Sequence, residues 1–363
     1  MGLRFFAALR MTGNKGLAMA NRNLHSQIKE TDNLESDRQR EMKFMPGKGK
    51  TIVVHGLTKI FDELVAVDNI SFEVEEGESF GLVGSNGAGK TTTLMMLATM
   101  LHPNSGSASI CGYSILNDKD KVRKSIGIVF EKMSLDTQLS GRENLDFHAR
   151  MYHLPKKIRQ KRIDEVLELA GLKDKADTVT KDYSGGMQRR LEIARSMLTQ
   201  PQVLLLDEPT VGLDVQTRRF MWDHVKELNR QQGVTVLLAT HYIEEADYLC
   251  DRIGIIDKGQ IITIDTPQAL KDSIGKSVIS LKLHNGPQED AARLFESLPW
   301  VKKLRQNNGF LELSLGTEDI NLADIAKLAQ ENGFAISSMR LRKPSLEDVY
   351  LHYVGKQFQK ENI

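Results

Sequence analysis

A glycine-rich turn followed by a lysine and a threonine is the first segment that could do chemistry. It reads Gly84-Ser-Asn-Gly-Ala-Gly-Lys-Thr91, and it lies between an apolar segment at 79–83 and an apolar helix predicted through Leu101. Glycines let backbone N–H groups approach a polyphosphate closely, and a helix N-terminus directs its dipole at the same phosphates. The spacing fits the phosphate-binding loop G-x-x-x-x-G-K-[ST]. We therefore expect this turn to bind a nucleotide.

The side chains of this loop have separable expected roles. Lys90 supplies a positive charge for the β and γ phosphates, and the Thr91 hydroxyl is a hard oxygen ligand suited to Mg²⁺. ATP and Mg²⁺ are therefore the predicted cofactors. The predicted nucleotide-binding residues of the loop are Gly84, Ser85, Asn86, Gly87, Ala88, Gly89, Lys90, Thr91 and Thr92.

Two adjacent carboxylates end a second apolar segment, Val203-Leu-Leu-Leu-Asp-Glu-Pro-Thr210. Two acids at a strand end could simply be solvated, but a phosphate-binding loop earlier in the same chain favours catalysis. Asp207 is then expected to hold Mg²⁺ through its water shell. Glu208 is expected to act as the base that polarises the attacking water.

A histidine follows a further apolar segment, 234–239, in the sequence Thr240-His241. A lone histidine at a strand end is commonly structural. Here the same sheet edge is predicted to host phosphate chemistry, which favours a direct role. We therefore predict that His241 holds the γ-phosphate and the attacking water in line.

Strands alternating with helices must position these residues. Short apolar runs of the kind found in strands buried on both faces are separated by helical stretches, which predicts an α/β core with a largely parallel sheet. The predicted strands are 52–54, 70–74, 79–83, 126–130, 203–206 and 234–239, and the clearest helices are 158–170 and 187–198.

After about Gly275 the pattern changes to a β-α-β-β-α-β order, which is the ferredoxin-like arrangement. A last helix over 346–354 follows Ser345, a plausible N-cap. We therefore predict an extension over 1–50, an ATP-binding domain over 51–275 and an accessory domain over 276–363. The predicted strands of the last domain are 278–283, 301–305, 310–315 and 335–341, its helices are 288–298 and 320–332, and a turn falls at Asn307-Asn-Gly309.

Composition bounds the class of protein. The formal net charge is +1, which argues against a nucleic-acid partner, and the two cysteines cannot form a disulfide framework. No apolar run reaches the roughly 18 residues of a membrane span, so we expect a cytoplasmic protein. Residues 1–50 carry ten Lys or Arg against five Asp or Glu. They are interpreted as a disordered extension, either without function, upstream of the true start, or contacting lipid headgroups.

One further motif makes a family resemblance specific. Tyr183-Ser-Gly-Gly-Met187, followed by Gln-Arg-Arg-Leu-Glu-Ile-Ala-Arg195, resembles the L-S-G-G-Q signature of ABC ATPases, with Tyr for Leu and Met for Gln. The resemblance implies the P-loop ABC nucleotide-binding fold, a mixed sheet core plus a helical subdomain. It also implies two such domains arranged head to tail. Each ATP would then be contacted across the interface by the partner's Ser184, Gly185, Gly186 and Asp214.

Within this family the chain is most similar to the ATP-binding subunits of daunorubicin-type drug exporters. Leu139-Ser-Gly-Arg-Glu-Asn-Leu145 and Ser345-Leu-Glu-Asp-Val-Tyr350 support this. The resemblance implies an ATPase that drives a separate membrane permease from the cytoplasmic face, with a second copy as partner and export favoured. It also places Phe61 where a ring stacks on adenine, although a core phenylalanine is the alternative. The competing functions are a soluble ABC ATPase acting on nucleic acid or ribosomes, and a regulatory module that barely hydrolyses.

The chain departs from the family pattern at one position. Where the family has a glutamine after the strand 126–130, this chain has Glu131, and Gln138 lies too far along the sequence to substitute. At about 5 Å and an effective dielectric of about 20, its repulsion of a phosphate charge is roughly 3 kcal/mol. Attraction to Mg²⁺ would offset part of this, or the side chain could bind in its protonated form. We expect Glu131 to ligate Mg²⁺ while slowing turnover or altering its pH dependence.

Overall fold

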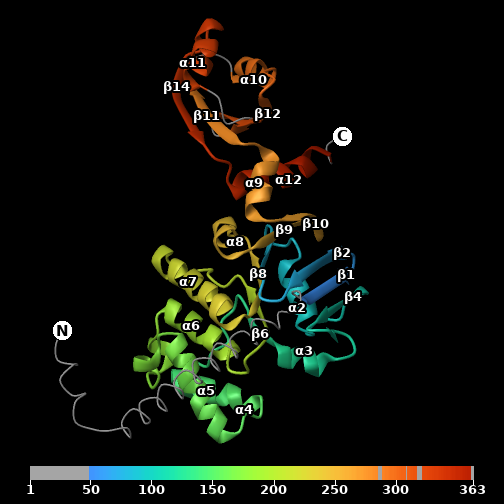
Figure 1. Ribbon diagram of the computed structural model, residues 1–363, viewed down its shortest axis with the longest axis vertical. Coiled ribbons are helices and arrows are strands. Elements are labelled where there is room, and N and C mark those ends of the chain that lie inside the picture. Colours follow the sequence, from blue (N-terminus) through green and yellow to red (C-terminus); the bar gives the residue numbers. More distant parts are fainter. Residues whose placement is uncertain (1–48, 285–287, 308, 317–320, 361–363) are drawn as a thin grey trace, which may run out of the picture. The chain divides into compact units, whose positions relative to one another are not determined.

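Three β-sheets organise the part of the chain that the computed structural model describes, residues 49–284, 288–307, 309–316 and 321–360 (Figure 1). Lys50–Ile363 form one compact unit. The extension expected over 1–50 lies almost entirely outside the described residues. The same holds for Asn308 of the predicted turn and for Ile320, where a predicted helix was expected to begin.

The central sheet carries the phosphate chemistry predicted from the sequence. It is a six-stranded mixed sheet in the order β10-β9-β3-β8-β7-β6, in which only the edge strand β10 is antiparallel to its neighbour. Strands β3, β7 and β8 are buried at every residue, as expected for apolar runs covered on both faces. The strands are β3 (Ser79–Val83), β6 (Ile126–Val129), β7 (Val203–Asp207), β8 (Thr235–Thr240), β9 (Arg252–Asp257) and β10 (Gln260–Asp265).

A four-stranded antiparallel sheet, in the order β2-β1-β4-β5, packs with the central sheet around a common core. Helix α2 (Lys90–Leu97) shares one core with both sheets, because Leu94 and Leu97 cluster with Ile52 of β1 and Leu205 of β7. The helix ends before the predicted Leu101, since Thr99 turns the chain with φ +62°. The strands of this sheet are β1 (Lys50–Phe61), β2 (Leu64–Glu75), β4 (Ser105–Ile110) and β5 (Tyr113–Ser114).

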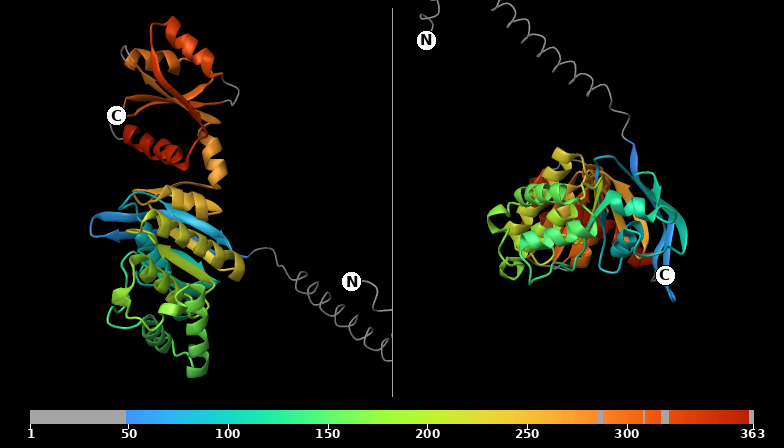
Figure 2. Two further views of the ribbon diagram at one scale, coloured as in Figure 1. Left: turned by 90° about the vertical axis from the view of Figure 1, so that its left-hand side faces the viewer. Right: turned by 90° about the horizontal axis from the view of Figure 1, so that it is seen from below.

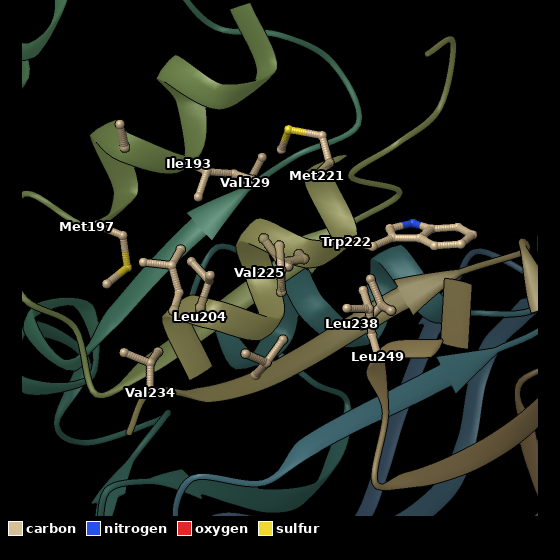
Figure 3. Close-up of a cluster of buried hydrophobic side chains, with 14 of the residues drawn as sticks. Val129, Ile193, Met197, Leu204, Met221, Trp222, Val225, Val234, Leu238 and Leu249 are labelled. Atoms are coloured by element: carbon tan, nitrogen blue, oxygen red, sulfur yellow. The ribbon is translucent and has the colours of Figure 1, made fainter. Parts of the chain in front are cut away.

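The other face of the central sheet is covered by helices. Leu204 and Leu238 of the sheet share one buried cluster with Ile193 of α6 (Gly185–Ser196), with Met197 directly after that helix and with Val225 of α7 (Val215–Gln232) (Figure 3). This confirms the predicted sheet core with a helical subdomain. The remaining helical elements of this part are α3 (Lys119–Ser125), α4 (Gly141–Met151), α5 (Lys156–Leu169), α8 (Ile243–Leu249), α9 (Pro267–Ile274) and the 3₁₀ turns Lys173–Lys175 and Thr180–Asp182.

A third sheet follows, in the order β12-β13-β11-β14 with every pair antiparallel. Leu281 and Leu313 on one face join Phe295 and Ile325 of two helices in a separate core, so both helices cover the same face (Figure 2). This confirms the ferredoxin-like prediction. The elements are β11 (Ser277–Leu283), α10 (Gln288–Glu296), β12 (Val301–Asn307), β13 (Phe310–Leu315), α11 (Leu322–Glu331) and β14 (Ile336–Arg342).

The last helix, α12 (Leu346–Lys360), does not join the core of this third sheet. Its Leu346 and Val349 are buried in the same cluster as Leu270 and Ile274 of α9, within the core that supports the central sheet. Ser345 caps it as predicted, because its Oγ accepts a hydrogen bond from the Asp348 N–H at 3.2 Å. The predicted domain division at residue 275 stays a prediction. Helix α12 follows this position in sequence but packs against residues that precede it.

Candidate functional site

The glycine-rich loop joins β3 to α2, as the sequence predicts, and its glycines are required by close backbone approaches. A Cβ on Gly84 would lie 2.2 Å from the Ile256 carbonyl oxygen. Gly89 has φ +103°, and a Cβ there would lie 2.5 Å from the Ala66 carbonyl oxygen. The backbone of Ile256 and Ala66 therefore leaves no room for a side chain at these two positions, whether or not a phosphate is bound.

Lys90 is buried, with 5% exposure, and its Nζ is already fixed. It donates to the carbonyl oxygens of Gly84 at 2.8 Å and Ser85 at 3.0 Å. It also lies 3.4 Å from Oε1 of Glu208. The ammonium group is thus held at the mouth of the loop by groups that an incoming phosphate could partly replace.

Thr91 and Asp207 meet at the carboxyl end of the parallel strands. The Thr91 hydroxyl donates to Asp207 Oδ1 at 3.0 Å. Burial, with a smaller contribution from the neighbouring Glu208 charge, raises the pKa of Asp207 to about 6, against the lowering effect of Thr91 and Lys90. A cation beside this carboxylate would relieve that penalty.

These two oxygen donors fit a magnesium ion bound mainly by nucleotide and water. Among the described residues no group of three His, Cys, Asp or Glu side chains is arranged as a metal site. Mg²⁺ is commonly held by one or two protein oxygens together with substrate phosphates and waters. A hydroxyl and one carboxylate are therefore a sufficient protein contribution.

Glu208 follows Asp207 in an unusual backbone conformation. Its φ is +48°, in the left-handed region that costs a non-glycine residue about 1–3 kcal/mol. Its buried carboxylate accepts from the His241 N–H at 3.3 Å and the Thr240 hydroxyl at 3.4 Å. The His241 Nδ1 lies 2.9 Å from Glu208 Oε2, an ion-pair distance without hydrogen-bond alignment. Lys90, Glu208 and His241 are thus brought together as predicted.

A further buried carboxylate, Glu245, lies next to this site and was not predicted. Glu245 of α8 is fully buried, and its Oε1 accepts from the Thr210 hydroxyl at 2.8 Å and the Trp222 Nε1 at 3.0 Å. Burial raises the pKa of Glu245. Nothing in the local sequence distinguishes it from the exposed Glu244, because the difference depends on which face of α8 is covered.

A buried arginine was also missed. Arg189 of α6 is 3% exposed, and its guanidinium binds backbone carbonyls at the end of β6 and after β7. The available signal was an arginine three residues before Glu192 on a helix with buried neighbours. That spacing also fits an ordinary surface ion pair.

The residues predicted to contact ATP across a dimer lie apart from the loop. Ser184 caps α6, with its Oγ accepting from the Met187 N–H at 3.3 Å, and Asp214 caps α7. In the described chain no hydrogen bond or ion pair joins the segment 184–186 to the segment 84–92. Gly185 and Gly186 open α6 beside Ser184.

The two remaining predicted contacts are exposed. Phe61 ends β1 with 41% exposure, so it is not the core residue that was the alternative, and Lys59 Nζ lies 5.0 Å from its ring centroid. Glu131 is exposed after β6, and its charge contributes to the raised pKa of Asp207 after burial and Glu208. Its acidic side chain therefore acts on the predicted metal ligand.

Comparison with known proteins agrees with this geometry. The family model described as ABC transporter matches residues 67–211, and that of the ATP-binding protein DrrA1-3-like, C-terminal domain, matches 266–354. The daunorubicin resistance ATP-binding protein DrrA3 of Streptomyces coeruleorubidus is 37% identical over 304 residues, covering 84% of this chain and 96% of the relative. The chain belongs to the family of ABC transporter ATP-binding proteins. This ABC protein binds ATP and hydrolyses it to ADP and phosphate.

Further relatives and solved structures extend the similarity. The linearmycin resistance ATP-binding protein LnrL of Bacillus subtilis is 36% identical to this ABC ATPase, over 83% of this chain and 97% of the relative. A dimeric ATP-binding cassette, MJ0796, bound to ADP and Pi, matches with TM-score 0.53 and 29% identity, over 59% of this chain and 98% of that one. CbiO1 of Clostridium perfringens, part of a cbiONQ transporter complex, matches with TM-score 0.57 and 29% identity, over 61% and 90%.

Proposed function

We propose that this ABC ATPase hydrolyses Mg-ATP with Glu208 as the base, and that the hydrolysis drives a separate membrane permease that exports drug-like or lipophilic compounds. The observation that carries the base assignment is the position of the Glu208 carboxylate. It is buried between Lys90 Nζ at 3.4 Å and His241 Nδ1 at 2.9 Å, on a backbone held at positive φ. A carboxylate fixed in this way can accept a proton from a water beside a γ-phosphate.

The other site residues supply binding and alignment. The loop 84–92 would wrap the phosphates, Lys90 would offset their negative charge, and His241 would hold the γ-phosphate. Thr91 and Asp207 would hold Mg²⁺, which when bound neutralises phosphate charge. Glu131 is proposed as a further contributor on the same side. Phe61, exposed at the end of β1, is proposed to stack on the adenine.

A second copy is proposed to complete each site, through Ser184, Gly185, Gly186 and Asp214 of the partner. Exposed apolar side chains beside these residues support a protein interface, since Val215 is 78% and Phe220 51% exposed. A pocket of about 240 Å³ between the starts of α6 and α7 lies at the same place. Dimerisation on ATP would cover it.

A membrane subunit is proposed to dock at the groove beside α4. This groove has a volume of about 400 Å³, and its lining includes Phe130, Ser134, Phe147, Met151 and Arg195. Phe147 and Met151 are exposed by 61% and 62%. Exposed apolar side chains rimmed by polar ones favour a protein contact. Among the described residues no helix is both long and apolar enough to cross a bilayer, and we propose a peripheral position on the cytoplasmic face.

The similarity to drug-resistance ATP-binding proteins supports export over import. The shared C-terminal domain strengthens this, because its family model matches residues 266–354 here. Cargo selection would belong to the membrane partner. The cellular test measures export of a lipophilic antibiotic by cells that carry this chain with its permease. We expect the Lys90→Ala variant to lose this export.

The site assignment is tested by ATPase activity of the purified full-length chain and of Glu208→Gln. The variant keeps the shape of the side chain but cannot accept the proton. We expect hydrolysis by the parent, loss by at least about 100-fold in the variant, and ATP-dependent dimerisation of the variant in size-exclusion chromatography.

The matched control is Glu168→Gln on the exposed surface of α5, where parent activity is expected. A Glu208→Gln variant with parent turnover would overturn the base assignment. A variant that remains monomeric with ATP, while retaining ATP binding, would overturn the composite site.

A further inference from the structure

Arg189 binds the backbone of the segment that carries the proposed base. Its guanidinium donates to the carbonyl oxygens of Pro209 at 2.6 Å, Glu208 at 3.0 Å and Asp207 at 3.2 Å. These are three successive residues around the base. The arginine lies on α6, whose first turn carries the signature motif, and its side chain is 3% exposed.

These contacts hold the backbone where it is strained. Glu208 has φ +48°, and such a conformation persists only when its surroundings fix it. The Glu208 N–H is bound to the Ala239 carbonyl oxygen at 2.8 Å, and Arg189 binds the carbonyl of the same residue and of both its neighbours. The planar guanidinium suits this task because its donors are fixed in a fork.

The same side chain reaches the segment that contains Glu131. Arg189 Nη1 donates to the Phe130 carbonyl oxygen at 2.5 Å and to Glu192 Oε2 at 3.0 Å. Glu192, 1% exposed, accepts through Oε1 from the Ser134 N–H at 2.6 Å and from its hydroxyl at 3.1 Å. Phe130 and Ser134 line the groove beside α4.

We propose that Arg189 and Glu192 form a positioning pair, which fixes the backbone of Glu208 and ties it to the 130–134 segment at the groove. The inference rests on the proposed function for the role of Glu208 as base. Neither side chain touches the reacting atoms. Movement of a partner in the groove would reach the base through this pair, by displacing Ser134 and Phe130 and with them the guanidinium.

Buried charge explains why the two residues must be tested together. Removing one partner of a buried ion pair leaves an uncompensated charge and commonly unfolds or weakens the protein, whereas removing both is far better tolerated. Arg189→Lys retains the charge balance, but an ammonium group has three donors and cannot replace the hydrogen bonds of the guanidinium to four carbonyls and to Glu192. The informative variants are therefore Arg189→Lys and the double variant Arg189→Gln/Glu192→Gln.

The matched control is Arg162→Gln/Glu165→Gln on α5. This pair has the same spacing, with 2.5 Å between Nη1 and Oε2, and Arg162 also binds backbone carbonyls, at Met197 and Leu198. It contacts neither Glu208 nor the 130–134 segment. We expect about 10- to 100-fold lower kcat in both Arg189 variants, KM for ATP within about 3-fold of the parent, and parent kcat in the control.

Amide hydrogen exchange of the full-length apo chain gives a readout that needs no turnover. Faster exchange is expected at both 207–213 and 130–136 in the Arg189→Lys variant, with the rest of the central sheet unchanged. Parent kcat in both Arg189 variants, or exchange that stays at the parent level in these two segments, would overturn the proposal. Turnover retained by Glu208→Gln would sink the base assignment instead, while the exchange result would still decide whether the pair fixes the loop.

Discussion

At the scale of single residues, the acidic side chain at position 131 lies where the family resemblance leads us to expect a glutamine. Glu131 follows β6, is exposed, and contributes to raising the pKa of Asp207 after burial and Glu208. A negative charge near the phosphates of bound ATP would oppose nucleotide binding. It would also oppose the negative charge that develops on the phosphate oxygens during hydrolysis. The charge of Glu131 is therefore expected to limit turnover.

Replacing Glu131 by Gln is expected to raise kcat of the ATPase or to shift its pH profile, because the variant removes one negative charge and keeps the side-chain shape. Steady-state hydrolysis between pH 6 and 9 measures both. Glu168→Gln on α5 removes the same charge at a distance and serves as control. Identical rate and pH profile for Glu131→Gln and the parent would contradict the expectation.

A half-buried histidine, His148 on α4, is expected to make the stability of the protein depend on pH. Burial, with the nearby Arg195 charge, lowers the pKa of His148 on α4 from 6.5 to about 4. Between pH 6.5 and pH 4 His148 is protonated in the unfolded chain but neutral in the folded chain. The stabilisation by neutral His148 is therefore complete above pH 6.5 and declines as pH falls towards 4.

His148→Gln is expected to lose less stability than the parent between pH 7.5 and 4.5, since the titrating group is gone. Urea unfolding at several pH values measures the difference in the free energy of unfolding. The free energy of unfolding of the parent, minus that of the variant, should fall steadily towards low pH. A parent-to-variant difference that is constant across this range would contradict the assignment.

Side-chain identity and spacing could predict Lys90, Thr91, Asp207, Glu208 and His241, since the motifs that carry them are local in sequence. Arg189 and Glu245 could not be predicted in the same way. The position of Arg189 depends on burial and on carbonyls that follow β6 and β7, which are distant along the chain. That of Glu245 depends on burial and on the Thr210 hydroxyl and the Trp222 Nε1. A local pattern carries no information on such contacts.

At the scale of elements, apolar runs predict the buried strands closely, because each run is covered on both faces. The strand predicted at 79–83 is β3, and that predicted at 203–206 is β7 with one further residue. The end of α2 was predicted too late, since the apolar residues Met100 and Leu101 continue after the chain has turned at Thr99. Apolar character alone did not distinguish helix from turn.

The N-terminus of α12 offers an element-scale test. Ser345 Oγ accepts from the Asp348 N–H, and Asp348 Oδ2 accepts from the Ser345 N–H at 2.8 Å, a reciprocal cap. Ser345→Ala is expected to lower the free energy of unfolding by about 1 kcal/mol. Chemical denaturation measures it, with the exposed Ser338→Ala of β14 as control. Equal stability of the two variants would show that the cap contributes nothing.

At the scale of the whole molecule, the described chain has separate cores that do not follow the linear order of its domains. The third sheet and its two helices have a core of their own. Helix α12, although it follows that sheet in sequence, buries Leu346, Val349 and Val354 in the core of the ATP-binding part. The β-α-β-β-α-β pattern was visible in the sequence, but the destination of the last helix was not.

Val349→Ala is expected to destabilise the ATP-binding part by about 1–3 kcal/mol, because the side chain is fully buried in that core. Leu351→Ala on the same helix, where Leu351 is 43% exposed, is the control. The fluorescence of Trp222, read in a Trp300→Phe background, reports unfolding of the relevant core. Equal midpoints of unfolding for the two variants would show that Val349 of α12 does not stabilise this core.

The return of α12 to α9 brings the chain on both sides of the third sheet to one surface. The chain leaves one core after α9, forms the third sheet and comes back to that core at α12, so both ends of the third sheet are anchored on the same surface. A C-terminal truncation that removes the third sheet also removes α12, and with it Leu346 and Val349 from the core that supports the central sheet. A replacement of the third sheet between these two ends would instead leave α9 and α12 in their shared core.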